Sequence, residues 1–154
     1  MSVMSLSVDV SNLAHTIQTA VAPVFLLTGI AGFLNMLTGR LSRVVDRARS
    51  IELSFTPPDH PRHRDQVREL RILDRRMKVV NTAIFLCTAS AVAVCLVVAG
   101  LFVTSLAGLG FARTMAVTFI VAMLLLIAGL VLFLVEVRIA VRAIQIRDEL
   151  LERQ

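Results

Sequence analysis

Three long apolar stretches dominate the pattern of hydrophobic and polar positions along the chain. They cover about residues 17–38, 79–106 and 114–136, and no Asp, Glu, Lys or Arg interrupts any of them before its last residue. A helix needs about 20 residues to cross a hydrocarbon core of roughly 30 Å. The pattern therefore predicts an all-α integral membrane protein with three transmembrane helices.

The first and second stretches continue as amphipathic helices beyond their apolar parts. After Gly39, apolar positions keep a helical spacing while Arg residues occupy another face. The run SFTPPDHPRH at 54–63 contains three Pro residues and must break the helix, and the helical pattern resumes at Arg64. We therefore expect helices one and two to extend into a helical hairpin of residues 39–78, here named the basic hairpin, in which Asp74 and Lys78 form an i,i+4 pair.

The positive charges predict how the chain is oriented in the membrane. Eleven Lys and Arg residues lie in the basic hairpin and four follow Glu136, whereas Arg113 alone lies between the second and third stretches. Short loops rich in Lys and Arg stay in the cytoplasm. We expect a single membrane domain of residues 1–154 with its N-terminus outside, and with the basic hairpin and a C-terminal helix of residues 137–154 in the cytoplasm. Glu149 and Arg153 would pair on that C-terminal helix.

Composition supports the membrane assignment and limits the choice of partner. Hydrophobic residues make up 56% of the chain and charged residues 18%, and the mean hydropathy is +0.80. These values lie outside the usual range of soluble domains. A net charge of +5 would suggest nucleic acid in a soluble protein, but here the topology already requires the basic residues. We expect anionic lipid headgroups, and no nucleic acid, as the partner.

Two segments of the chain resemble a known family. They are LAHTIQTAVAPVFLLTGIAGFLNMLTGRLSRVVDRAR at 13–49 and RRMKVVNTAIFLCTASAVAVCLVVAGLF at 75–102. Both resemble the bacterial domain-of-unknown-function family 2721, which consists of small integral membrane proteins. The resemblance implies a bacterial inner (plasma) membrane protein of about three helices, and it implies no reaction, ligand or catalytic residue.

Small and polar residues form a stripe along one face of the first helix. Their steps of four, three, four and three are those of a heptad pattern: Thr28, Gly32, Asn35, Gly39 and Ser42. Small residues let helices approach closely, and an Asn in hydrocarbon requires a hydrogen-bonding partner. The stripe predicts helix packing, within one protomer or in a homo-oligomer, and the homo-oligomer is favoured. The alternative is that the stripe lines a pore. Shorter stripes occur on the second helix at Ala83, Cys87 and Ser90, with Asn81 about one turn below, and on the third at Thr114, Thr118, Ala122 and Gly129.

A basic cluster follows the first apolar stretch, at Arg40, Arg43, Arg47 and Arg49. Arg can bind phosphate in a bidentate manner, so one interpretation is a site for an anion or a lipid headgroup. The other is that these residues hold the helix at its depth at the membrane surface, with Asp46 pairing to Arg43 or Arg49. Because the topology already demands positive charge here, we favour anchoring.

The chain carries no motif typical of catalysis. It has no phosphate-binding loop, no His-Glu-x-x-His sequence and no carboxylate within an apolar stretch before its end. Asp59, His60 and His63 lie on a Pro-rich turn and make a poor metal site. We expect no enzyme, cofactor or metal, and predict a homo-oligomeric structural or interaction protein. The alternative is a homo-oligomeric, anion-selective ion channel.

Overall fold

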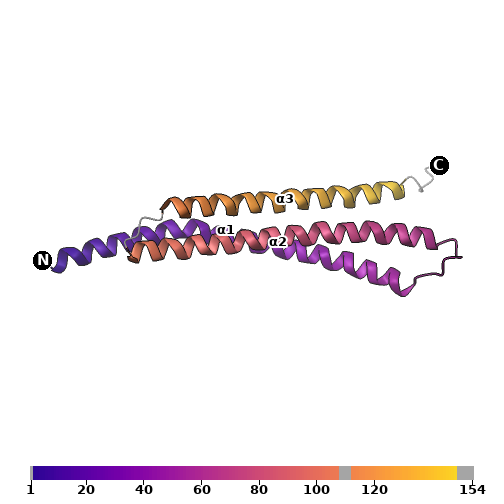
Figure 1. Ribbon diagram of the computed structural model, residues 1–154, viewed down its shortest axis with the longest axis horizontal. Coiled ribbons are helices and arrows are strands. Elements are labelled where there is room, and N and C mark those ends of the chain that lie inside the picture. Colours follow the sequence, from indigo (N-terminus) through magenta and orange to yellow (C-terminus); the bar gives the residue numbers. More distant parts are fainter. Residues whose placement is uncertain (1, 108–111, 149–154) are drawn as a thin grey trace. The chain divides into compact units, whose positions relative to one another are not determined.

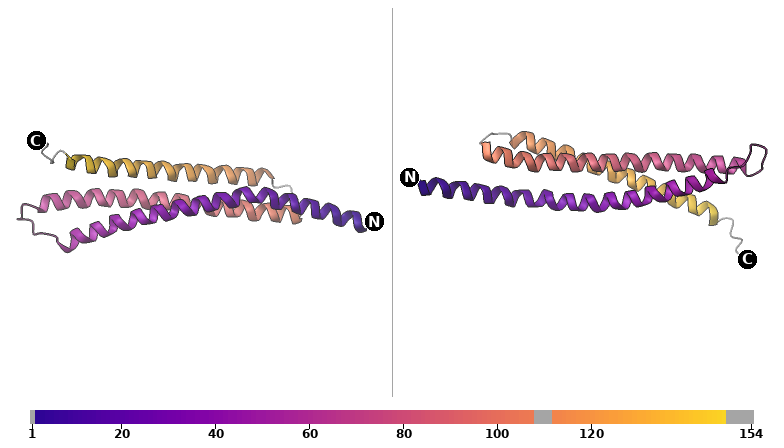
Figure 2. Two further views of the ribbon diagram at one scale, coloured as in Figure 1. Left: turned by 180° about the vertical axis from the view of Figure 1, so that it is seen from behind. Right: turned by 90° about the horizontal axis from the view of Figure 1, so that it is seen from below.

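A computed structural model of the chain contains three long α-helices (Figure 1). They are α1 at Ser2–Leu53, α2 at His63–Ala107 and α3 at Ala112–Asp148. The structure describes residues 2–107 and 112–148, and the side chains of residue 14 and of residues 17–106 and 113–141. Although Pro23 lies inside α1, the helix is continuous in both views of Figure 2. Neighbouring helices in a membrane protein can tolerate such a Pro.

All three helices are long and apolar enough to cross a membrane. Only 11–22% of the most apolar 18-residue segment of each helix is buried inside the protein. Large apolar residues such as Phe25 and Phe85 therefore remain about 70% exposed. Exposing such surface to water is unfavourable, whereas lipid tails solvate it well. The prediction of an all-α protein with three membrane-crossing helices is confirmed by length and composition.

The chain divides into two compact units, and the first comprises Met1–Phe33 and Cys87–Ile127. Its buried residues are mostly small or of medium size. Ser90 on α2 and Ala122 on α3 are both fully buried, and Ser90 Oγ donates a hydrogen bond of 2.7 Å to the Ala122 carbonyl oxygen. Such a contact requires close approach of two helix backbones, which small residues permit.

The second unit comprises Leu34–Leu86 and Ala128–Gln154. Its apolar core joins Val44, Ala48 and Ile51 of α1 to Leu73 of α2, with Leu70 and Met77 packed against them. These positions recur at helical spacing, so each helix buries one face. The segments of α1 and α2 on either side of residues 54–62 therefore pack directly on each other.

The turn at residues 54–62 is tied to the first turn of α2 by Gln66. The Thr56 backbone N–H and hydroxyl both donate to Gln66 Oε1, at 3.0 and 2.7 Å, and Gln66 Nε2 donates to the Ser54 carbonyl oxygen at 3.0 Å. Phe55 and His63 make an edge-to-face contact with ring centroids 5.1 Å apart. These contacts give the Pro-rich turn a defined conformation.

Candidate functional site

The most unusual polar feature is Glu136 on α3, whose side chain is completely buried. It accepts hydrogen bonds from two arginines of different helices. Arg40 Nη1 of α1 lies 3.2 Å from Glu136 Oε2, and Arg76 Nη2 of α2 lies 2.7 Å from Glu136 Oε1. Each carboxylate oxygen therefore holds one guanidinium, and the group joins all three helices. We name these three residues the Glu136 cluster.

The sequence places the members of the Glu136 cluster at matching ends of the apolar stretches. Arg40 follows the first stretch, Arg76 precedes the second, and Glu136 is the last residue of the third. An unpaired carboxylate would be very unfavourable in a buried position, and two charge-assisted hydrogen bonds offset that cost. Arg40 also lies over the Phe133 ring, 5.3 Å from its centroid. The cluster carries two positive charges against one negative charge.

A cavity of about 320 Å³ adjoins this cluster, lined by Arg40, Arg43, Val44 and Arg76. The Nε atom of Arg76 is buried and has no hydrogen-bond partner among the described residues. Arg43 is exposed and makes no ion pair with any acid whose side chain the structure describes. The cavity is therefore lined by three arginines, and Arg43 among them has no described ion-pair partner.

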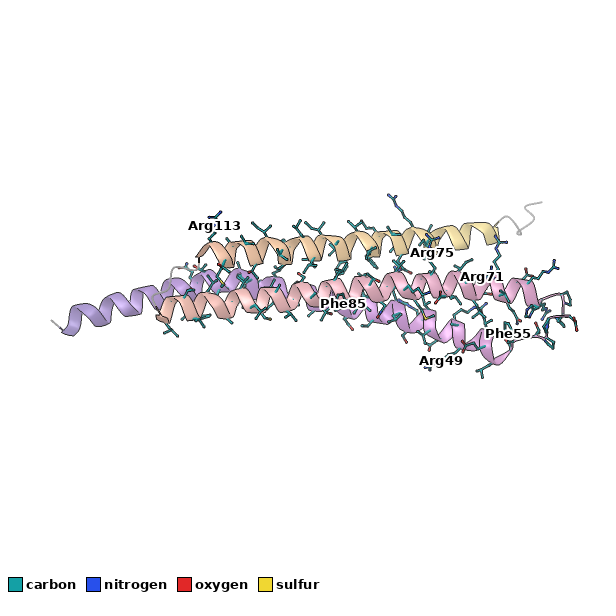
Figure 3. All side chains as sticks on the ribbon, in the orientation of Figure 1. Arg49, Phe55, Arg71, Arg75, Phe85 and Arg113 are labelled. Carbon is teal, nitrogen blue, oxygen red and sulfur yellow. The ribbon has the colours of Figure 1, made fainter. Side chains whose placement is uncertain are left out.

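The four residues of the predicted basic cluster have different environments. Arg40 binds Glu136, and Arg47 pairs with Glu69 at 2.8 Å, with both of these side chains about half exposed. Arg43 and Arg49 are exposed, and Arg49 projects from the outer side of α1 (Figure 3).

The expected pairing of Asp46 with Arg43 or Arg49 is wrong. Asp46 Oδ2 instead accepts a hydrogen bond of 3.4 Å from Ser42 Oγ. Ser42 precedes Asp46 by four residues, so the hydroxyl lies one helical turn away on the same face.

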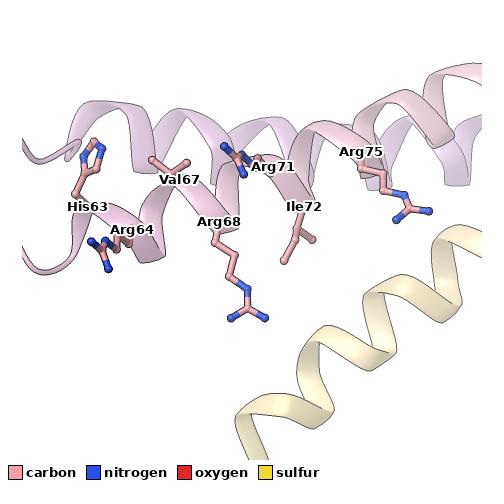
Figure 4. A pocket seen from close by; sticks show the side chains of 7 residues that line it. All are labelled: His63, Arg64, Val67, Arg68, Arg71, Ile72 and Arg75. Atoms are coloured by element: carbon pink, nitrogen blue, oxygen red, sulfur yellow. The ribbon is translucent and has the colours of Figure 1, made fainter. Parts of the chain in front are cut away.

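Four arginines form a continuous row along α2. Arg64, Arg68, Arg71 and Arg75 follow one another at steps of four, three and four, and together with His63, Val67 and Ile72 they border a cavity of about 680 Å³ (Figure 4). We name these four residues the Arg ridge. All four are exposed, and none pairs with an acid in the part of the chain whose side chains are described.

The small-residue stripe of α1 is open along its whole length. In the first unit Thr28 and Gly32 are exposed, and in the second unit Asn35, Gly39 and Ser42 are exposed. A Cβ atom added at Gly32 or Gly39 would meet no neighbouring atom within 4 Å. The larger buried residues described on α1 repeat every seven positions on its opposite face, at Ile30, Leu37, Val44 and Ile51.

The shorter stripes of α2 and α3 behave differently. Ala83, Cys87 and Ser90 of α2 are completely buried, whereas Asn81, about one turn below them, is exposed. On α3, Ala122 and Gly129 are buried, Thr118 is half-buried and Thr114 is exposed. Packing within the protomer therefore uses the small residues of α2 and most of those of α3, but leaves the α1 stripe uncovered.

The remaining predicted polar positions serve the local structure. Asp74 Oδ2 and Lys78 Nζ are 2.8 Å apart, which confirms the predicted pair. His63 Nδ1 lies 2.9 Å from the Thr56 carbonyl oxygen, and His60 Nδ1 accepts a hydrogen bond from the Arg62 N–H. In the described part of the chain no three His, Cys, Asp or Glu residues gather as a metal site. The predicted pair of Glu149 and Arg153 lies outside the described residues.

Comparison with known proteins identifies the family. A family model described as "Protein of unknown function (DUF2721)" matches residues 20–146. The chain belongs to this family. The DUF2721 match confirms the resemblance expected from the sequence, and its range includes the Glu136 cluster, the Arg ridge and the stripe of α1. No curated protein and no solved structure matches the chain.

Sequence reasoning missed the role of Glu136 and Arg76. The available signal was a lone acid at the end of a long apolar stretch, because a carboxylate there requires a partner if the helices pack around it. The matching positions of Arg40 and Arg76 at the ends of the other two stretches identify the partners. Pairing across helices is a tertiary property, and helical spacing within one segment does not reveal it.

Proposed function

We propose that this protein is a non-enzymatic, homo-oligomeric membrane protein that binds partners through its basic hairpin. In this proposal the chain lies in the bacterial inner membrane with its N-terminus outside. The basic hairpin and the C-terminal end of α3 lie in the cytoplasm, because short segments rich in Lys and Arg remain there. Anionic lipid headgroups surround the basic ends of the helices.

The observation that carries the proposal of self-association is the open stripe of α1. Asn35 is exposed within an apolar helix, and nothing lies within 4 Å of a Cβ added at the neighbouring Gly32 and Gly39 positions. An exposed Asn facing lipid is unfavourable, and small residues on either side allow a second helix to approach it closely. A second copy of α1 would satisfy both requirements at once.

The experiment that tests self-association is native mass spectrometry of purified protein released from detergent or nanodiscs. We expect a defined oligomer for the wild type, and loss of that oligomer for Asn35→Leu, because Leu removes the polar group that needs a partner. Asn81→Leu is a matched control, since Asn81 is also exposed but lies on α2.

Three outcomes would contradict self-association through α1. The first is a wild-type protein that is monomeric under all conditions. The second is an oligomer that Asn35→Leu leaves intact, which would assign the contact to another face. The third is an oligomer that Asn35→Leu and Asn81→Leu dissociate to the same extent.

The Arg ridge supports an acidic protein segment as a partner of the basic hairpin. Arg64 and Arg75 are separated by about 17 Å along the α2 axis. Since α2 continues into a membrane-crossing segment, lipid headgroups would reach the ridge only at its Arg75 end. An acidic helix lying along α2 could meet all four arginines, and its charges would complement a row that no described acid neutralises.

Binding of a labelled helical peptide rich in Glu would test this use of the ridge. The double variant Arg64→Gln and Arg68→Gln should lower the affinity by about fivefold or more, because two exposed charged contacts of roughly 0.5–1 kcal/mol each disappear. The charge-matched control is Arg49→Gln with Arg62→Gln, since both residues are exposed and neither borders the ridge cavity. An equal loss in the two double variants would show attraction to net charge only.

The alternative function is an anion-selective pore formed by several copies. The exposure of Thr28, Asn35 and Ser42 on one face of α1 favours it, because a ring of such faces would present polar groups to a central path. Currents through protein-containing liposomes under a salt gradient test the idea. A change in selectivity for Arg40→Glu would support it, but that variant also breaks the Glu136 cluster. Arg43→Glu is the cleaner variant, and tight bilayers without current would reject the pore.

A further inference from the structure

We propose that Arg40, Arg43 and Arg76 form a binding site for the phosphate group of a phosphoester, with Glu136 as the residue that positions two of the three arginines. These three arginines, together with Val44, line one cavity of about 320 Å³. Arg40 and Arg43 come from α1 and Arg76 comes from α2, so the site depends on the packing of two helices. The inference rests on the proposed membrane orientation only in naming a lipid as the source of that phosphate.

The donors around the cavity match an oxyanion with several acceptor oxygens. Arg76 lines the cavity, and its one described ion pair, with Glu136, uses Nη2 only. Arg43 is exposed and has no described ion-pair partner. Guanidinium groups present paired donors that suit phosphate geometry. Against the single carboxylate of Glu136, the three arginines leave two positive charges for a ligand.

Glu136 keeps Arg40 and Arg76 at the border of the cavity. Its carboxylate is fully buried and accepts from each of them, at 3.2 and 2.7 Å. Without it, two long side chains would be free to extend into solvent. The carboxylate also competes with a bound anion for the same guanidinium groups, so it both orders the site and limits its affinity.

The level of the site along the helices points to a lipid as the source of the phosphate. Arg40 lies just beyond the first apolar stretch and Arg76 lies just before the second, while Glu136 closes the third. Lipid phosphates lie at the boundary between the hydrocarbon core and water, which is where these residues would be. A soluble phosphoester would reach the same cavity from the aqueous side.

Native mass spectrometry with added lipid tests the proposal on the full chain. Phosphatidylglycerol is the anionic probe, phosphatidylcholine is the zwitterionic comparison, and inorganic phosphate as a competitor reports a soluble source. Arg43→Gln should lower phosphatidylglycerol binding by about fivefold. Arg43 has no described ion pair, so the change leaves the Glu136 cluster intact. Arg49→Gln removes the same charge six residues further along α1 and should leave binding unchanged within about twofold.

A second variant is expected to act in the opposite direction. Glu136→Gln removes the competing negative charge, and its amide oxygen can still accept from one arginine while its NH2 group cannot accept from the other. Phosphatidylglycerol binding should tighten in the folded protein, because the released arginine becomes available to the phosphate. Circular dichroism of each variant shows whether it has folded. If Glu136→Gln does not fold, the difference in phosphatidylglycerol binding between Arg43→Gln and Arg49→Gln still tests whether the phosphate site includes Arg43.

The outcomes distinguish a lipid phosphate from a soluble phosphoester as the ligand, and both of these from the absence of a phosphate site. Selective phosphatidylglycerol binding that Arg43→Gln alone weakens supports a lipid site. Displacement of that lipid by inorganic phosphate, with the same pattern among the variants, supports a phosphate site open to soluble phosphoesters. Equal losses for Arg43→Gln and Arg49→Gln, or no loss for either, would overturn the proposal. The same spectra report the oligomeric state, so failure of this site is distinguishable from failure of self-association.

Discussion

The Glu136 cluster and the Arg47–Glu69 pair are two ion-paired regions of the second unit with very different surroundings. Glu136 is completely buried, and its partners Arg40 and Arg76 are 33% and 20% exposed. In the other pair, the side chains of Arg47 and Glu69 are 55% and 43% exposed. The shortest donor–acceptor distances are similar, at 2.7 and 2.8 Å. Geometry alone therefore does not distinguish the two regions.

The difference in burial determines how strongly each group depends on its partner. Water and dissolved salt can replace the partner of a half-exposed charge at little cost, so such a pair contributes between zero and about 1 kcal/mol. A buried carboxylate has no such replacement, and losing a partner leaves an uncompensated charge. We therefore expect the Glu136 cluster to stabilise the packing of three helices, and the Arg47–Glu69 pair to have little effect on stability.

The largest effect is expected for Glu136→Ala. This change leaves Arg40 and Arg76 without their acceptor and opens space beside them, so the free energy of unfolding should fall by about 3 kcal/mol. Equilibrium unfolding in mixed micelles, followed by circular dichroism, measures it. Glu52→Ala is a suitable control because Glu52 is an exposed glutamate on α1. Equal stabilities for the two variants would mean that the buried, paired Glu136 contributes no more to stability than an exposed glutamate.

A smaller difference in stability is expected between variants of the two arginines in the Glu136 cluster. Arg76 lies closer to Glu136 than Arg40 does and is less exposed. Arg76→Gln should therefore destabilise the protein more than Arg40→Gln, by about 1 kcal/mol. A double-mutant cycle of each change with Glu136→Gln isolates the coupling to the carboxylate. A larger coupling for Arg40 would reverse the order inferred from distance and exposure.

The smallest effect is expected for the exposed pair. Arg47→Ala and Glu69→Ala should each change the unfolding free energy by about 0.5 kcal/mol or less. The coupling energy between them should vanish in 1 M salt, where charges are screened within about 3 Å. Measuring the same cycle at low and high salt checks both statements. A coupling energy that persists in high salt would mean that the Arg47–Glu69 pair is as well protected from screening as a buried ion pair.

Several features of the fold could be predicted from the sequence because they depend on local pattern. The three apolar stretches indicated three membrane-crossing helices, and Pro57, Pro58 and Pro61 marked the break between α1 and α2. The pair of Asp74 and Lys78 followed from i,i+4 spacing alone. In each case the deciding interaction lies within a few residues of the chain.

The small-residue stripes show where local pattern stops being informative. Residues of similar type and spacing are buried on α2 at Ala83 and Ser90, but exposed on α1 at Gly32 and Asn35. Heptad spacing predicts that a face will pack, and it carries no information about which helix covers that face. The tertiary structure shows that the protomer covers one stripe and leaves the other open.

The sequence by itself determined the helices, their apolar stretches and the excess of positive charge at their ends, because periodicity and composition act within each segment. Only the tertiary structure decided that Arg40 and Arg76 meet at Glu136, a pairing that spans 96 and 60 residues of the chain. Such long-range partners depend on how helix faces pack, and a buried charge selects them because an unpaired carboxylate in that position would be too unfavourable.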